Sequence, residues 1–188
     1  MKDVVVIDAS LAAMWGMPEA FTDRALALAS KWAQEGIQPI APSLILPEIT
    51  NAFYKRVIRG ETDLATAIEA LHIVLDFGIE IREEPGLHAR AKELSHQMNR
   101  PNTYDCHYLA LSEIHHCLLW TGDQRFFNSV KKTFPRVKWI GKVQEELDDY
   151  DDLRSLREAK ETEKDAPTIG MAELKKKIGR RTSQSRRR

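Results

Sequence analysis

The sequence has little cysteine, no net charge and no long apolar run, and each shortage excludes a class of protein. Its two cysteines, Cys106 and Cys117, cannot form a disulfide framework and lack the spacing of metal ligands. We therefore expect a reducing, cytoplasmic setting. No apolar run approaches the ~18 residues of a membrane span. No basic-apolar leader opens the chain, so we expect no signal peptide and no membrane association.

The zero net charge of the 188 residues conceals two charge blocks. Residues 144–165 carry ten acids and four bases, a charge of −6, whereas residues 171–188 carry eight bases and one acid, a charge of +7. Such a polar, charge-blocked stretch is typical of a disordered segment or a solvated helix. We therefore predict a globular domain over residues 1–141, large enough to bury a core. A charged extension, acidic and then basic, follows over residues 142–188.

Short apolar strands alternate with helical segments along the first 141 residues. Val4–Ile7 is a run of apolar, mostly β-branched residues, typical of a strand buried on both faces of a parallel sheet. Further strands are predicted at residues 37–41, 79–82, 117–121 and 137–140, with helical periodicity between them. This alternation predicts an α/β fold with three layers, α/β/α, around a parallel central sheet.

Hydroxyl side chains precede three of the predicted helices. We expect Ser10 to cap a short helix that Pro18 ends, and Ser43 to cap a helix with Pro47 near its first turn. We expect Thr62 to cap the helix over residues 63–77.

Four acids follow these elements at positions that converge. Asp8 and Asp123 each come just after a predicted strand, and Glu48 and Asp105 lie near the starts of helices. In open α/β sheets the carboxyl ends of the strands form the binding crevice, so all four can point into one cleft. Crowded carboxylates repel one another, and divalent cations relieve that repulsion. Hard oxygen ligands suit Mg²⁺ or Mn²⁺, and two such ions about 3.5–4 Å apart can promote phosphodiester cleavage.

Four short motifs contain these acids: VIDAS at residues 6–10, PEITNA at 47–52, TYDCHYLALSE at 103–113 and LWTGDQRF at 119–126. In this order and at these separations they resemble the PIN-domain nucleases, most closely the VapC-type toxin ribonucleases of toxin–antitoxin pairs. The resemblance covers about residues 1–141. It implies a Mg²⁺- or Mn²⁺-dependent endoribonuclease that acts on RNA, forms a homodimer and is neutralised by a small antitoxin protein.

The resemblance also implies residue roles. Asp8, Glu48, Asp105 and Asp123 match the acidic quartet of the family, which binds the metal and is catalytic. Ser10 and Asn51 stand where the family often has polar helpers, and Thr121 resembles the Thr or Ser that precedes the last acid. Cleavage by this chemistry would leave 5′-phosphate and 3′-hydroxyl ends.

Several basic residues near the acids in the sequence are candidates for contacts with RNA phosphate. Lys55, Arg56 and Arg59 follow Glu48 on the same predicted helix, and Arg125 follows Asp123 by two residues. The alternative for the first three is a solvated helix end, where cations are favoured. The alternative for Arg125 is an exposed turn cation.

Other functions stay open at this point. Each acid taken alone can be an ordinary turn or cap residue. A non-catalytic PIN-like module that binds RNA or a protein is one alternative. A phosphatase of the haloacid dehalogenase type is another, but it needs a second Asp where this chain has Ser10. The extension can be a disordered solubilising tail, an RNA-binding arm, or an acidic segment that covers the cleft as a nucleic-acid mimic.

Overall fold

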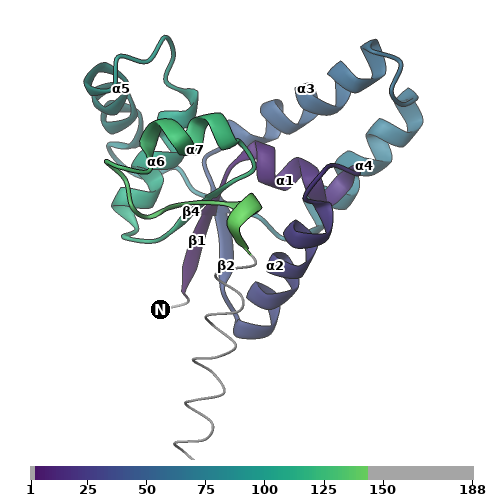
Figure 1. The fold of residues 1–188 in the computed structure, drawn as a ribbon, viewed down its shortest axis with the longest axis horizontal. Coiled ribbons are helices and arrows are strands. Elements are labelled where there is room, and N and C mark those ends of the chain that lie inside the picture. Colours follow the sequence, from purple (N-terminus) through teal and green to yellow (C-terminus); the bar gives the residue numbers. More distant parts are fainter. Residues whose placement is uncertain (1–2, 144–188) are drawn as a thin grey trace, which may run out of the picture. The chain divides into compact units, whose positions relative to one another are not determined.

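The computed structural model describes residues 3–143, which form a five-stranded sheet between helices (Figure 1). The strands are β1 (Val4–Ile7), β2 (Gln38–Ala41), β3 (Glu80–Ile81), β4 (Leu119–Thr121) and β5 (Val137–Trp139). Their order across the sheet is β3-β2-β1-β4-β5, and every neighbouring pair is parallel. The predicted parallel α/β/α architecture is therefore confirmed, and all five predicted strands are present.

The central strands of the sheet are the most deeply buried. Val6, Ile7 and Leu119 have no exposed surface, which is why β1 and β4 carry almost only apolar side chains. Their register pairs Val6 with Leu119 and Ile7 with Trp120. The two strands therefore end side by side, and the residues that follow them, Asp8 and Gly122-Asp123, enter the same edge of the sheet.

Helices cover both faces of the sheet, with α1–α4 on one side and α5–α7 on the other (Figure 1). Their bounds are α1 (Ala9–Gly16), α2 (Thr22–Glu35), α3 (Ile45–Ile58), α4 (Leu64–Asp76), α5 (Leu87–Gln97), α6 (Tyr104–Ile114) and α7 (Gln124–Val130). A short 3₁₀ helix, Ile140–Lys142, follows β5. Within residues 3–143, no helix is both long enough and apolar enough to cross a membrane.

The predicted hydroxyl caps are wrong. Asp8, not Ser10, caps α1, and Asp63, not Thr62, caps α4; each carboxylate accepts a hydrogen bond from a backbone N–H three residues on. Ser43 precedes the capping position of α3, and its own N–H donates to Glu83 Oε1 at 2.8 Å. In α1 and α4 an acid accepts the N–H of the first turn, and a carboxylate there also interacts favourably with the positive end of the helix dipole, whereas α3 has no side-chain cap.

Apolar side chains of the helices fill the space against the sheet. Trp15, Trp32 and Trp120 are each at most 5 % exposed, and Trp32 meets Trp120 edge to face with ring centroids 6.4 Å apart. The predicted charged extension, apart from residues 142 and 143, lies outside the described residues. Its predicted structure and roles therefore stay predictions.

Candidate functional site

A cavity of about 900 Å³ opens at the carboxyl ends of β1 and β4. All four acids of the predicted quartet line it: Asp8, Glu48, Asp105 and Asp123. The cavity lies between α1, the N-terminal half of α6, the connection from β4 to α7 and one face of α3. Residues separated by as much as 115 positions in the chain (123 − 8) thus share one hollow.

Asp8 is the most enclosed of the four acids, with 8 % of its surface exposed. Its Oδ1 atom accepts hydrogen bonds from Ser10 Oγ at 2.7 Å and from the Leu11 N–H at 2.9 Å. Burial raises the pKa of the Asp8 carboxyl to about 6, although the hydrogen bonds from Thr121, Ser10 and Leu11 act against the rise. Asp8 is therefore both a helix cap and a carboxyl group whose ionisation is costly.

Two hydroxyl groups tie the ends of β1 and β4 together. The Gly122 N–H donates to Ser10 Oγ at 2.8 Å, and the Asp123 N–H donates to Thr121 Oγ1 at 2.9 Å. The two hydroxyl oxygens are 3.3 Å apart. A Cβ atom on Gly122 would lie 2.8 Å from the Ser10 carbonyl oxygen, so glycine is required there. Ser10 and the buried Thr121 thus fix the backbone that carries Asp8 and Asp123.

Asp123 stands at the cavity in the same way as Asp8. It caps α7, because its Oδ1 atom accepts hydrogen bonds from the N–H groups of Arg125 at 2.7 Å and Phe126 at 3.0 Å. Both caps described here use Oδ1 of the aspartate. The reading of these acids as ordinary caps is therefore correct for their helices, and it does not remove them from the cavity.

Tyr108 is a residue of the site that the sequence analysis missed. It is 2 % exposed, lines the cavity, and donates from its hydroxyl to Glu48 Oε2 at 2.5 Å. Burial and the neighbouring Glu48 charge raise the pKa of the phenol, so it stays a donor. Its position three residues after Asp105, on the same helix face, was the available signal.

The acids also act on one another through their charges. Burial raises the pKa of Glu48, the bond from Tyr108 lowers it, and the charges of Asp8 and Asp105 raise it further. Loss of solvent around the carboxyl group inside the cavity raises the pKa of Asp105, with Arg100 acting to lower it and Asp123 to raise it. The cavity thus holds negative charge that the fold itself does not fully compensate.

The donor chemistry of this cavity fits a hard divalent cation. Four carboxyl groups supply oxygen atoms, and a cation would relieve the repulsion that raises their pKa values. As the side chains of residues 3–143 are placed, however, no three acidic, histidine or cysteine side chains form a group that could hold a metal ion. The carboxylates share a cavity without forming a closed set of ligands.

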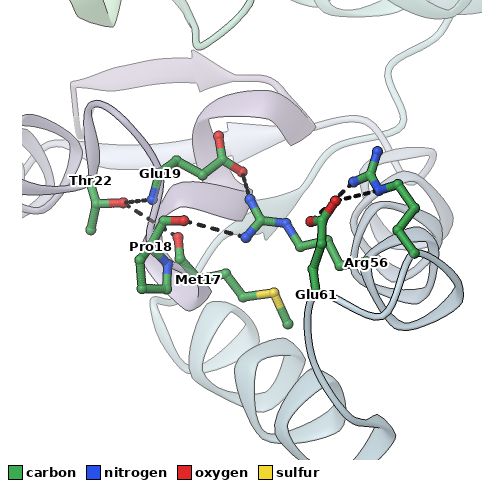
Figure 2. A network of polar contacts seen from close by, with 7 residues as sticks. Met17, Pro18, Glu19, Thr22, Arg56 and Glu61 are labelled. Carbon is green, nitrogen blue, oxygen red and sulfur yellow. Dashed lines mark hydrogen bonds and ion pairs between the residues drawn. The ribbon is translucent and has the colours of Figure 1, made fainter.

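Cations border the cavity along α3. Lys55, Arg56 and Arg59 all line it, as does Asn51, which lies between them and Glu48. Arg125 is exposed and is not among the lining residues. Figure 2 shows that Arg56 reaches Glu19, an acid of the connection between α1 and α2 that also lines the cavity. Glu19 carried no sequence signal, because its contact spans 37 residues.

Comparisons with known proteins agree with this architecture. A family model described as "PIN domain" matches residues 20–171, a stretch that contains Glu48, Asp105 and Asp123 and begins after Asp8. Among solved structures, the crystal structure of PAE2754 from Pyrobaculum aerophilum is similar, with a TM-score of 0.53 and 21 % sequence identity. The similarity covers 76 % of this chain and 95 % of that one, and at this identity it speaks for the fold. No curated protein matches the sequence.

Proposed function

The chain belongs to the PIN-domain family, whose members are commonly nucleases, and from this premise we propose that it is a Mg²⁺- or Mn²⁺-dependent endoribonuclease of the VapC toxin type. One observation carries the proposal: acids and cations divide a single cavity between them. Asp8, Glu48, Asp105 and Asp123 occupy one part, and Lys55, Arg56 and Arg59 line the wall formed by α3.

A polyanion matches this division of charge. Along the wall formed by α3 and its C-cap Arg59, the acid Glu48 and the last cation, Arg59, are about 16 Å apart at a rise of 1.5 Å per residue. A single phosphate cannot reach from the acids to this stripe of cations, Lys55, Arg56 and Arg59, so a ligand that occupies both parts of the cavity carries several phosphates. Lys and Arg side chains contact such a backbone without reading its sequence.

The four acids have distinct parts in the proposal. Asp8, Glu48 and Asp105 would hold a Mg²⁺ or Mn²⁺ ion, with Asp123 beside them or acting through water. The ion, when bound, supplies the positive charge that activates water and stabilises the leaving oxygen. Tyr108 fixes the orientation of Glu48, while Ser10 and Thr121 hold the backbone of the two strand ends.

The proposal extends to partners. A toxin of this type would pair with a small antitoxin protein, form a homodimer and act in the cytoplasm. The motif resemblance supports these three statements.

RNA cleavage by point variants tests the proposal. We expect the purified protein to cut RNA with Mg²⁺ or Mn²⁺, and Asp8→Asn and Asp105→Asn to abolish cutting, because Asn keeps the shape of Asp and removes its charge. Asp76→Asn, an exposed acid at the end of α4, is the matched control and should cut normally. Mn²⁺ should raise the melting temperature of the parent protein and of Asp76→Asn, and have less effect on the other two variants.

The outcomes separate enzyme from binding module. Among residues 3–143 no three acidic, histidine or cysteine side chains are close enough together to hold a metal ion, and this observation favours a non-catalytic module. Well-folded protein that binds RNA and never cuts it would establish that module. Cutting that survives in both Asp variants would place the active site elsewhere.

A further inference from the structure

The Arg56 guanidinium at the cavity wall is already bound to an anion of the protein itself. Its Nη2 lies 2.5 Å from Glu19 Oε1, and its Nη1 donates to the Pro18 carbonyl oxygen at 3.3 Å (Figure 2). The Arg56 side chain is 20 % exposed and that of Glu19 is 30 % exposed. This is a half-buried ion pair at the rim of the cavity, with both members among the lining residues.

The backbone of Glu19 is held in place for this contact. Its N–H donates to Thr22 Oγ1 at 2.8 Å, and its carbonyl oxygen accepts from the Thr22 N–H at 3.2 Å. Thr22 Oγ1 also donates to the Met17 carbonyl oxygen at 3.4 Å (Figure 2). This turn directs the Glu19 carboxylate at α3, so the pair does not depend on a freely moving loop.

The other two cations of the stripe are arranged differently. The Lys55 ammonium group makes no hydrogen bond or ion pair with any residue in the described range 3–143. Arg59 pairs with Glu61, two residues away in the chain, and both side chains are about half exposed. Arg56 alone among the three is fixed by an acid from a different part of the fold.

We propose that Arg56 is a binding subsite for an RNA phosphate and that the Glu19 carboxylate occupies this subsite until RNA displaces it. This inference rests on the proposed function, since it takes RNA as the ligand. A guanidinium binds carboxylate and phosphate through the same planar set of donors, so one anion can take the place of the other. A partly buried guanidinium without an anion is unfavourable, and exchange of anions avoids that state.

The subsite lies away from the bond that is cut. Arg56 follows Glu48 by eight residues on α3, about 12 Å along the helix. Arg56 therefore contacts a phosphate other than the scissile one, equally in the ground state and in the transition state. Removing the competing acid should strengthen RNA binding and leave the chemical step unchanged.

Binding of a fluorescein-labelled single-stranded RNA of mixed sequence tests the exchange. Measured by anisotropy in an Asp105→Asn background, so that the RNA stays intact, Glu19→Gln should bind about fivefold more tightly, the equivalent of a half-buried ion pair of about 1 kcal/mol. Arg56→Gln should bind more weakly and reduce the slope of log affinity against log salt by about 0.7. In protein that retains Asp105, Glu19→Gln should lower KM by the same factor without changing kcat.

Two comparisons separate the exchange from general charge repulsion. Glu113→Gln removes the same charge from an ion pair with Arg90, 2.7 Å long, between α6 and α5 and outside the cavity; its RNA affinity should stay within about twofold. Combined with Arg56→Gln, the substitution Glu19→Gln should have no further effect, because Glu19 acts through Arg56.

Each failure points to a different statement. If RNA is cut but Glu19→Gln binds it no more tightly, the exchange is wrong and the ribonuclease proposal stands. The exchange is also wrong if Glu113→Gln tightens binding equally, or if the gain from Glu19→Gln persists beside Arg56→Gln. If the parent protein neither binds nor cuts RNA, the proposed function fails. Glu19→Ala repeats the test should the Gln variant fold poorly.

Discussion

Asp8→Asn should make the protein more stable at neutral pH while it destroys the proposed activity. The pKa of the Asp8 carboxyl is raised from 3.8 to about 6 in the folded protein, chiefly by burial. Between these two values the folded chain holds a proton that the unfolded chain has lost. The free energy of unfolding contributed by this group therefore falls as pH rises from about 4 to about 6.

The size of this stability effect follows from the difference between the ordinary pKa of Asp8 and its pKa in the folded protein. At about 1.36 kcal/mol for each pH unit, ionising Asp8 in the folded protein costs about 3 kcal/mol above pH 6. Asn carries no charge, caps a helix as well as Asp does, and its oxygen can accept the bonds from Ser10 and Leu11. The substitution should thus remove most of that cost.

Urea unfolding in the presence of EDTA measures this difference in stability, with the fluorescence of the buried tryptophans as the signal. We expect Asp8→Asn to equal the parent protein at pH 4 and to exceed it by up to about 3 kcal/mol at pH 8. Asp123 caps α7 from an exposed position, so Asp123→Asn is the matched control, and we expect it to bring no gain in stability. A stability difference that is the same at pH 4 and pH 8, or a variant that is less stable at pH 8, would refute the reasoning.

Three further predictions concern single contacts. Tyr108→Phe leaves the Glu48 carboxylate without its 2.5 Å partner and should lower the free energy of unfolding by about 1.5–3 kcal/mol in urea titrations. Gly122→Ala forces a Cβ against the backbone of α1 and should cost about 1–3 kcal/mol and reduce cleavage in parallel, as unfolding and RNA assays would show. Asp63→Ala should lower the melting temperature through loss of the α4 cap, while Thr62→Ala should not; equal effects would mean that Asp63 is not the functional cap.

Local sequence patterns were enough to predict the parallel sheet and the presence of the four acids in one cavity. A buried run such as Val4–Ile7 has one stable environment, the centre of a parallel sheet, and an acid directly after it has to emerge at the carboxyl edge. The same holds for Asp123 after β4. The start of α3 brings Glu48 to that edge, because a helix that follows a parallel strand begins there. The start of α6 brings Asp105 to the same edge, because a helix that leads into a parallel strand, here β4, runs back from the carboxyl edge.

The caps could not be read with the same certainty. Thr62 and Asp63 are adjacent and both belong to residue types that cap helices, so the pattern leaves the boundary open by one residue. The contact that decides it, from the Thr66 N–H to Asp63 Oδ1 at 2.9 Å, exists only once α4 has its final start. Ser43 was misread for a different reason, since Glu83, forty residues away, engages its N–H.

Long-range polar contacts left no local pattern at all. Glu19 and Arg56 are ordinary surface residue types in their own segments, and only the packing of α1 against α3 makes them partners. Arg125 was chosen for its closeness to Asp123 in the chain, yet it is not among the residues that line the cavity. Its contact with RNA phosphate therefore stays a prediction.

The central position of β1 beside β4 determines when the site can exist during synthesis. The neighbour of β1 on one side is β4, residues 119–121, which is synthesised much later than β1. Gly122 and Asp123 follow β4 directly. A nascent chain that has left the ribosome as far as β3 has Asp8 and Glu48 but lacks the strand that positions them against Asp105 and Asp123. The proposed ribonuclease site therefore cannot assemble, and cannot attack the messenger or the ribosome that is making the chain, until residue 123 has left the ribosome.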